Sequence, residues 1–247
     1  MTHINIHIKS KRYPAIGQAQ PHLAIENLQL SVQPSEFICL VGPSGCGKTT
    51  LFNIIAGLDQ DFEGDISLAT GQQRHPKIGY VFQNPRLLPW RTVRENIELA
   101  LSGPQSNDSI ASLIAAMQLT DMQHVYPERL SLGMSRRVAI IRAFAVNPDL
   151  LLMDEPFVSI DAPTARQVRT LLLQLWQQRP HSVLFVTHDL REAIALADRL
   201  VFLSPPPMSV ITEISVPITR QDRNDDAALE AFRQQLLHDY PKIRTLV

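Results

Sequence analysis

A glycine-rich stretch between an apolar run and an apolar-periodic segment constrains this chain more than any other feature. Residues 42–50 read GPSGCGKTT and fit the pattern G-x-x-x-x-G-K-[ST], with Gly42, Gly47, Lys48 and Thr49 at the fixed positions. The preceding EFICLV is typical of a buried strand, and the following TTLFNIIAGL is typical of a helix with one apolar face. This strand–loop–helix unit predicts an α/β core whose loop binds phosphate.

The residue types in this loop suit an anionic ligand. Glycines let successive backbone N–H groups wrap around a phosphate, and the N-terminus of the following helix adds its positive dipole. We expect Lys48 to neutralise β- and γ-phosphate charge and the Thr49 hydroxyl to bind Mg²⁺. The remaining predicted nucleotide contacts in the loop are Pro43, Ser44, Gly45, Cys46 and Thr50. The flanking pattern favours a nucleotide site over a plain glycine-rich turn.

A second apolar run, LLLMDEP at residues 150–156, ends in two acidic residues. A strand that delivers a carboxylate beside the metal suits Asp154 to Mg²⁺ binding. Glu155 can orient or deprotonate an attacking water, which indicates hydrolysis rather than binding alone. Taken alone, a strand followed by a solvated acidic turn explains this stretch equally well. The phosphate loop earlier in the chain favours the functional interpretation.

Two further polar residues follow predicted strands. His188 comes directly after SVLFVT, where its imidazole can contact the γ-phosphate or the water. Gln83 follows IGYVF, where its amide can reach Mg²⁺ or the water. The alternatives stay open at this point, because a lone histidine is more often structural and a glutamine at a strand end is often an ordinary loop residue.

Short apolar runs alternate with helical periodicity along the chain, which predicts an α/β fold with a largely parallel sheet. The predicted strands are 37–41, 78–82, 150–153, 183–187 and 200–203. The predicted helices are 49–56, 110–117, 134–145, 163–178 and 190–198. From about residue 84 to 145 the pattern is helical without a convincing strand, which indicates a helical insertion. The prolines at 205–207 predict a rigid turn into a terminal polar helix.

Composition narrows the class of protein. A chain of 247 residues with 45% hydrophobic and 19% charged residues is typical of a globular protein. The net charge of −1 gives no electrostatic case for nucleic acid as a partner, so the pair Arg136–Arg137 is interpreted as surface or packing charges. Two cysteines, Cys39 and Cys46, fit a reducing compartment. Without a signal-peptide pattern or a membrane-span pattern, we expect a cytoplasmic chain.

The ordered set of motifs resembles the ATP-binding subunit of ABC (ATP-binding cassette) transporters over roughly residues 3 to 203. In the order of that family the chain carries the phosphate loop, Gln83, LSLGM, LLLMDEP, SID at 159–161 and THD at 187–189. The resemblance implies a RecA-like P-loop NTPase core with a mainly parallel sheet, an antiparallel N-terminal β portion and an inserted α-helical subdomain. The implied parts of a single 1–247 domain are a core at 1–84 and 146–220, a signature subdomain at 85–145 and a C-terminal helical extension at 221–247.

The resemblance also implies cofactors and site roles. ATP and Mg²⁺ would be bound, and Tyr13 would stack on the adenine, with a surface tyrosine as the alternative. Gln83 would couple the γ-phosphate to the helical insertion, and His188 would be the switch histidine. Asp161 would belong to the D-loop, where members of the family usually read Ala-Leu-Asp and this chain reads Ser-Ile-Asp.

The signature motif of the family, LSGGQ, has drifted to LSLGM in this chain. Leu132 replaces a glycine and Met134 replaces the glutamine, whereas Ser131 and Gly133 remain to contact the γ-phosphate of a second cassette. The alternative is that Ser131 merely caps a helix. A side chain at position 132 is harmless if its φ is negative and strained if the site needs a glycine. We expect a composite site that still works, although the two replacements can slow it.

Partners follow from the resemblance as well. A second cassette subunit, taken as a homodimer, would complete each ATP site. Transmembrane permease subunits would dock near 84–101, where Pro89 and Trp90 lie, although Trp90 fits core packing equally well. An extracytoplasmic solute-binding protein would take part indirectly.

The stretches LLPW, TVREN and DEPFVSIDAPTA look most like importers of nitrate, sulfonates and taurine. The predicted function is therefore an ATP-hydrolysing importer subunit on the cytoplasmic face of the inner membrane, serving a small oxyanion or sulfonate-type solute. A soluble cassette ATPase acting on DNA or ribosomes is one alternative, and the chain has neither heptad runs nor metal-spaced cysteines for it. A regulatory nucleotide sensor with an impaired signature site is the other, and Glu155 with His188 argues against it.

Overall fold

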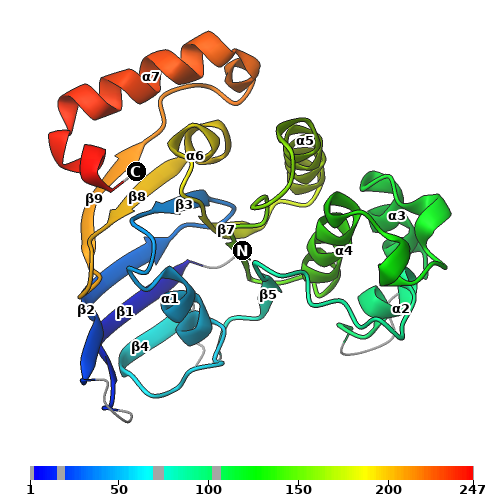
Figure 1. The fold of residues 1–247 in the computed structure, drawn as a ribbon, viewed down its shortest axis with the longest axis horizontal. Helices are drawn as coiled ribbons and strands as arrows, with labels where there is room; N and C mark the ends of the chain where they lie inside the picture. The colour runs from blue at the N-terminus through cyan, green and yellow to red at the C-terminus, as the bar shows by residue number, and fades with distance from the viewer. Residues whose placement is uncertain (1–2, 16–19, 69–74, 102–106, 247) are drawn as a thin grey trace. The chain divides into compact units, whose positions relative to one another are not determined.

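The chain forms two compact units in a computed structural model (Figure 1). The described residues are 3–15, 20–68, 75–101 and 107–246. Met1–Pro76 and Ser182–Val247 make unit 1, and Lys77–His181 make unit 2. The phosphate loop and His188 therefore belong to unit 1, whereas both acidic residues of the LLLMDEP stretch belong to unit 2.

A three-stranded antiparallel sheet in unit 1 is the N-terminal β portion that the sequence predicts. Strand β1 (Ile4–Tyr13) lies between β2 (His22–Val32) and β4 (Glu63–Leu68). Along β1, Ile4, Ile6 and Ile8 are buried while the residues between them are exposed, which is the period-2 pattern of a half-buried strand. Tyr13 is the last residue of the strand, so pairing within the sheet fixes the position of its backbone.

The other strands of unit 1 surround the strand that leads to the phosphate loop. Strand β3 (Phe37–Val41) pairs in parallel with β7 (Ser182–Val186) on one side and β8 (Arg199–Leu203) on the other. All residues of β3 and β7 are buried, as in a parallel strand covered on both faces. Because parallel strands end at the same edge, the phosphate loop after β3 and His188 after β7 share that edge.

Three helices accompany these strands in unit 1, namely α1 (Lys48–Ile55), α6 (Leu190–Leu196) and α7 (Asp226–Asp239). Helix α6 ends two residues before its predicted end. The reason is Asp198, whose backbone N–H and carboxylate both bond to Phe37, which draws the chain into the start of β8. The terminal polar helix α7 exists as predicted.

The prolines at 205–207 precede this helix as predicted, and a strand that was not predicted lies between them. The chain first forms β9 (Val210–Ser215), which pairs antiparallel with β8. Its side chains alternate between half-buried and exposed, and its β-branched residues Val210, Ile211 and Thr212 suit an edge strand. The open edge of β8 therefore recruits a strand before the chain turns to helix.

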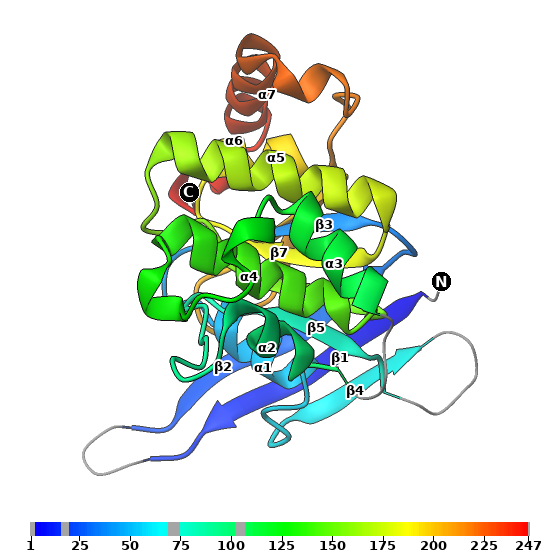
Figure 2. The ribbon, with the colours of Figure 1, turned by 90° about the vertical axis from the view of Figure 1, so that its right-hand side faces the viewer.

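Unit 2 combines a parallel strand pair with helices. Strand β5 (Ile78–Val81) pairs with β6 (Leu150–Asp154), and the described residues between them are helix or loop, as predicted. The helices are α2 (Val93–Glu98), α3 (Asn107–Ala116), α4 (Leu132–Ala145) and α5 (Ala162–Gln178). Helix α4 packs against the other three and against β5 (Figure 2). It is the central element of unit 2.

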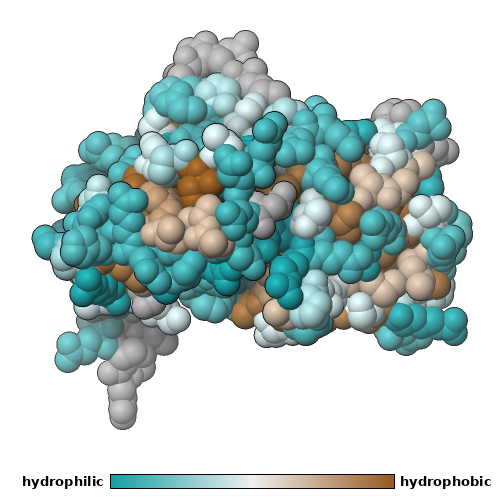
Figure 3. All heavy atoms as spheres, turned by 90° about the horizontal axis from the view of Figure 1, so that it is seen from above, coloured by the Kyte–Doolittle hydropathy of each residue, from teal (hydrophilic) through white to brown (hydrophobic). Residues whose placement is uncertain are grey.

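Hydrophilic residues predominate on the face shown in Figure 3, with apolar residues in small patches between them. Within the part of the chain that the structure describes, no helix has both the length and the apolar character to span a membrane.

Candidate functional site

The phosphate loop joins β3 to α1 and takes its shape from glycine. Gly45 and Gly47 have φ of 76° and 114°, a backbone region that residues with a side chain rarely adopt. Gly47 is also the N-cap of α1, and no side chain caps this helix start. An anion suits this end of α1, because the first N–H groups of a helix have no acceptor within the helix and because of the helix dipole.

Lys48 is held inside this loop. Its side chain is buried, and Nζ donates to the carbonyl oxygens of Gly42 at 2.8 Å and Pro43 at 2.9 Å. The ammonium is thus fixed against the loop that would enclose a phosphate. The thiol of Cys46 lies 3.8 Å from Nζ, and burial raises its pKa, so it stays protonated and does not compete as an anion.

Tyr13 lies beside the helix that follows the phosphate loop. Its hydroxyl is 3.1 Å from Oγ1 of Thr50, and the residue is 38% exposed. The ammonium of buried Lys11 lies 4.8 Å from the centre of the tyrosine ring, a cation–π contact that orients it. A base would stack on the ring face opposite Lys11. The contact with Thr50 fits the predicted adenine role, which stays a prediction.

His188 is exposed and follows β7 directly. It lines an open cavity of about 460 Å³ together with residues of α6 and α7, and no residue of the phosphate loop lines that cavity. The next residue, Asp189, accepts from the backbone N–H groups of Arg191 and Glu192 and so caps α6. A capped turn therefore carries His188, whose contact with the γ-phosphate stays a prediction.

In unit 2 the structure brings two predicted catalytic residues together. Gln83 follows β5 and Glu155 follows β6, and the Gln83 amide Nε2 lies 3.4 Å from a carboxylate oxygen of Glu155. Glu155 has φ of 44°, a left-handed conformation that is uncommon outside glycine and concentrates at functional sites. Asp154 is the last residue of β6 and is almost fully buried. The pKa of Tyr80 is raised first by the burial of its own hydroxyl and next by the negative charge of Asp154.

The side chains that could hold Mg²⁺ carry oxygen donors, which this hard cation prefers. They are the exposed hydroxyl of Thr49 in unit 1, and the carboxylate of Asp154 and the amide of Gln83 in unit 2. The described residues contain no group of three or more His, Cys, Asp or Glu that could hold a metal by itself. Mg²⁺ usually relies on phosphate and water for part of its coordination, and the three residues stay predicted ligands.

The drifted signature motif opens α4. Ser131 is exposed and is the N-cap, with its hydroxyl accepting from the backbone N–H of Met134 at 3.2 Å. The capping alternative is therefore realised, and an exposed N-cap hydroxyl also remains available to a ligand. Leu132 is the first residue of the helix and has no left-handed backbone. The side chain that replaces glycine there is consequently unstrained.

Gly133 has a packing role that the sequence does not reveal. It is buried, and a Cβ at this position would lie 2.5 Å from Cγ2 of Thr164 on α5. The backbone N–H of Thr164 is in turn capped by the Asp161 carboxylate at 2.9 Å, which lowers the pKa of that acid. Asp161 is thus the N-cap of α5. The contacts of Gly133 and Asp161 with a second cassette stay predictions.

The sequence does not predict a site role for two buried polar residues of unit 2, and the first is Arg136. Its side chain is 3% exposed, so the surface interpretation is wrong for it and the packing interpretation is right. It donates to backbone carbonyls of Phe82, Gln83 and Val158. The available signal was its spacing, because Gly133, Arg136 and Ile140 follow the helical period of the buried face.

The second is Asn96 on α2, which is 1% exposed. Its amide donates to the carbonyls of Leu88, Arg91 and Thr92, and its oxygen accepts from the N–H of Leu88 at 2.7 Å. This side chain therefore fixes the loop that carries Trp90. Its signal was again helical spacing, with apolar neighbours in the same turn.

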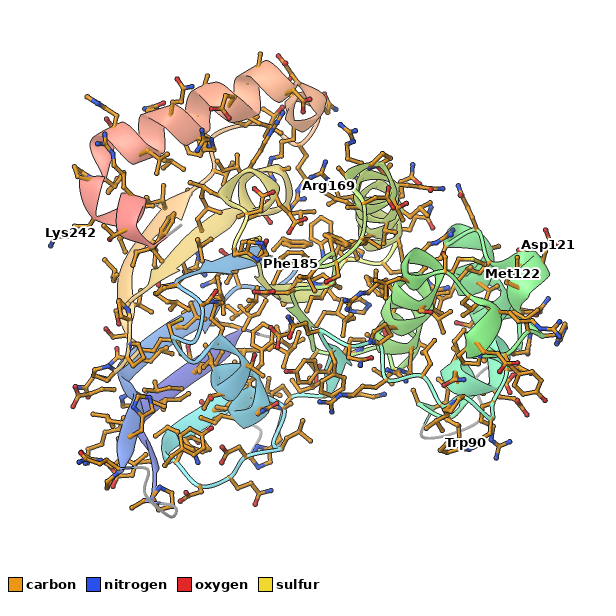
Figure 4. The ribbon with its side chains drawn as sticks, in the orientation of Figure 1. Trp90, Asp121, Met122, Arg169, Phe185 and Lys242 are labelled. Carbon is orange, nitrogen blue, oxygen red and sulfur yellow. The ribbon has the colours of Figure 1, made fainter. Side chains whose placement is uncertain are left out.

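Large apolar side chains are exposed around α2. Trp90 is 69% exposed, so core packing is wrong for it, and it lies at the outer edge of unit 2 (Figure 4). Leu99 at the end of α2 is 55% exposed and Tyr126 is 45% exposed. Tyr126 belongs with them because the neighbouring Val125 accepts from the N–H of Val93 in α2. The predicted permease contact near 84–101 stays a prediction.

The ABC transporter family model matches residues 25–158. The aliphatic sulfonates import ATP-binding protein SsuB of Bacillus subtilis (strain 168) is 36% identical, with 98% of this chain and 96% of that protein covered. The nitrate import ATP-binding protein NrtD of Synechococcus elongatus is 40% identical, with 91% and 83% covered. A solved dimeric bacterial ABC transporter cassette superposes with a TM-score of 0.73 at 30% identity, covering 87% of this chain and 100% of its own. With the phosphate loop and the Gln83–Glu155 pair in place, the chain belongs to the ABC transporter family and is an ATPase of it.

Proposed function

We propose that this chain is the ATP-hydrolysing subunit of an importer that takes up a small oxyanion or sulfonate-type solute through separate permease subunits. The observation that carries the proposal is similarity along nearly the whole chain to two import ATP-binding proteins, one named for aliphatic sulfonates and one for nitrate. Both names describe small anions that carry oxygen atoms. The solute class follows from that shared chemistry.

In this proposal ATP lies on the phosphate loop, with Lys48 at its phosphates and Tyr13 at its adenine. Bound Mg²⁺, held by Thr49, Asp154 and Gln83, supplies positive charge to the phosphate oxygens. Glu155 orients or deprotonates the attacking water, and the Gln83 amide fixes its carboxylate at 3.4 Å. His188 contacts the γ-phosphate from the same sheet edge as the phosphate loop.

Two copies of the chain would share each ATP. The solved cassettes that this chain resembles are dimeric, and one of them is bound to ADP and Pi. Ser131 and Gly133 would then act at the γ-phosphate bound by the other copy, where the N-terminus of α4 adds its positive dipole. The helical conformation of Leu132 supports this role, because the drift of the motif leaves the backbone of the helix start intact.

The exposed apolar side chains around α2, namely Trp90, Leu99 and Tyr126, would receive the permease subunits at the cytoplasmic face of the membrane. A solute-binding protein would act on the permease from the other side. ATP-driven closure of the two cassettes would move the docked permease, and hydrolysis would reopen them. Asn96 holds the loop of Trp90 in shape for this contact.

ATP turnover of purified wild type and Glu155→Gln tests the enzymatic part. We expect turnover to fall by about 10²- to 10⁴-fold in the variant, the range for loss of a general base, with ATP binding retained. Glu128→Gln, an exposed acid of the same unit, is the control and should turn over ATP like wild type. Wild-type turnover no faster than that of Glu155→Gln contradicts the proposal.

Co-purification in detergent with the permease subunits encoded by neighbouring genes tests the transport part. We expect Trp90→Ala to lose the permease while keeping ATP turnover, because the substitution removes apolar area from the docking surface. Leu58→Ala is the matched control, since Leu58 is 63% exposed but belongs to unit 1. Equal recovery of permease with both variants places the docking surface elsewhere.

A further inference from the structure

Helix α4 carries a buried guanidinium that joins two loops of the site. Arg136 donates through Nη1 to the carbonyl oxygens of Phe82 and Gln83, and through Nη2 to that of Val158 at 3.2 Å. The first two carbonyls belong to the loop after β5, and the third belongs to the loop between β6 and α5. One side chain therefore holds both loops.

Because Arg136 is charged and buried, its bonds to the three carbonyls strongly constrain the positions of both loops. Burial alone lowers its pKa, and no carboxylate in the described part of the chain pairs with it. Arginine still stays protonated in proteins, so the buried charge must be satisfied by the carbonyl dipoles. If either loop moves away, one of the two Nη groups of the buried guanidinium loses its acceptor.

The two loops held by Arg136 are the ones that carry the Gln83–Glu155 contact. Gln83 gives Arg136 its carbonyl and gives Glu155 its amide. Val158 accepts from Arg136 with its carbonyl, while its N–H donates to the carbonyl of Glu155 at 3.2 Å. Arg136 thus constrains the backbone on both sides of a 3.4 Å side-chain contact.

We propose that Arg136 is a positioning residue that holds Gln83 and Glu155 together for ATP hydrolysis and ties them to the helix opened by the signature motif. The inference rests on the proposed function of Glu155 and Gln83. Arg136 lies in the second turn of α4, so a displacement of the helix start is transmitted to both loops. The drifted motif and the hydrolytic pair are mechanically joined by this residue.

A neighbouring arginine provides the matched control. Arg137 lies on the same helix, its pKa is also lowered by burial, and its guanidinium donates to the carbonyl of Met117 at 3.0 Å. Met117 follows α3 and belongs to neither loop. Arg142 further along α4 bonds the carbonyls of Pro85 and Arg86 and keeps the far end of the first loop attached. Loss of Arg136 should therefore act locally.

The experiment compares ATP turnover, KM for ATP and melting temperature of Arg136→Ala and Arg137→Ala. We expect kcat of Arg136→Ala to fall about tenfold, a change of about 1.4 kcal/mol in the barrier, with KM within a factor of about two. KM should hold because the phosphate loop keeps its own contacts. Added guanidinium ion, below denaturing concentration, should restore kcat of Arg136→Ala only. Arg137→Ala should lose stability while keeping kcat and KM.

Equal loss of kcat in the two variants, or no effect of guanidinium on Arg136→Ala, overturns the inference. If Arg136→Ala does not fold, Arg136→Lys provides the test of the bridge. An ammonium cannot bond both loops at once as the planar guanidinium does. We expect its kcat to lie below wild type, and a wild-type value overturns the bridge. Absence of ATP turnover in wild type itself overturns the proposed function, whereas normal wild-type turnover with unaffected Arg136 variants overturns only the inference.

Discussion

The phosphate loop of unit 1 and the paired loops around Gln83 and Glu155 in unit 2 are built in different ways. The phosphate loop is shaped from within, since Lys48 bonds carbonyls only five and six residues away and two glycines have positive φ. The paired loops are held from outside by Arg136, which lies 53 residues from Gln83. A loop of the first kind carries its shape in its own sequence, whereas a loop of the second kind depends on the rest of the unit.

This difference predicts different responses to mutation. In the phosphate loop a substitution should change the affinity for nucleotide and leave the surrounding unit intact. In unit 2 a substitution at a packing or bridging position should change stability or kcat before it changes affinity.

The largest effect is expected for Lys48→Ala. Removal of the ammonium should weaken ATP binding about a hundredfold, or roughly 3 kcal/mol, because a charge-assisted contact with phosphate is lost. The melting temperature without nucleotide should change little, since Lys48 bonds only carbonyls of its own loop. Calorimetric titration with ATP and a thermal melt measure the two quantities.

Lys9→Ala serves as the control for Lys48→Ala, because Lys9 is exposed and belongs to the same unit. It should bind ATP like wild type. Binding by Lys48→Ala within about twofold of wild type would mean that the backbone N–H groups of α1 bind the phosphates without the lysine. The backbone of the loop would then account for phosphate binding by itself.

The features that could be predicted from the sequence divide in the same way, into locally determined ones and ones that depend on distant residues. The strand Phe37–Val41 and the loop after it could be predicted, because each is set by residues within a few positions. The role of Gly133 was not, since its neighbour Thr164 lies 31 residues further along the chain and on another helix. The burial of Arg136 was hard to predict, because arginine is rarely buried and most often lies on the surface. Strand β9 was not predicted, because an edge strand with one half-buried face has only a weak apolar pattern.

An intermediate effect is expected for Gly133→Ala, which tests whether unit 2 responds through packing. The new Cβ would lie 2.5 Å from Cγ2 of Thr164, so the Thr164 side chain or the helices α4 and α5 must shift. We expect a loss of about 1–3 kcal/mol in the free energy of unfolding, the usual cost of overpacking. Thr164→Ala removes the obstructing methyl group, and the double variant should regain most of the stability and the ATP turnover, because alanine keeps the backbone N–H.

Urea denaturation of the two single variants and the double variant gives the coupling between the positions. Thr164→Ala alone is the control, since it should lower stability only slightly at a half-buried site. A double variant as unstable as Gly133→Ala would show that the contact with Thr164 is not the cause. A stable double variant with little turnover would assign Gly133 a further role at the γ-phosphate.

The smallest effect concerns the start of α2, where side-chain-to-backbone bonds hold a surface helix in unit 2. Thr92 and Glu95 form a capping box, and the bonds from the backbone N–H and hydroxyl of Thr92 lower the pKa of Glu95. Thr92→Ala should cost about 1 kcal/mol of stability. Because the carboxylate has a lowered pKa in the folded state, its contribution is present above the ordinary glutamate pKa of about 4.3 and is lost as the pH falls below it.

Glu95→Gln should therefore lower the melting temperature near neutral pH and flatten its decline below about pH 4.5. Glu128→Gln, an exposed acid without a capping role in the same unit, should leave the profile as in wild type. Identical profiles for Glu95→Gln and Glu128→Gln would show that the charge of Glu95 adds no measurable stability, because a glutamine at this position can still complete the capping box. The start of α2 would then be held by neutral side-chain bonds, as the loop of Trp90 is held by buried Asn96.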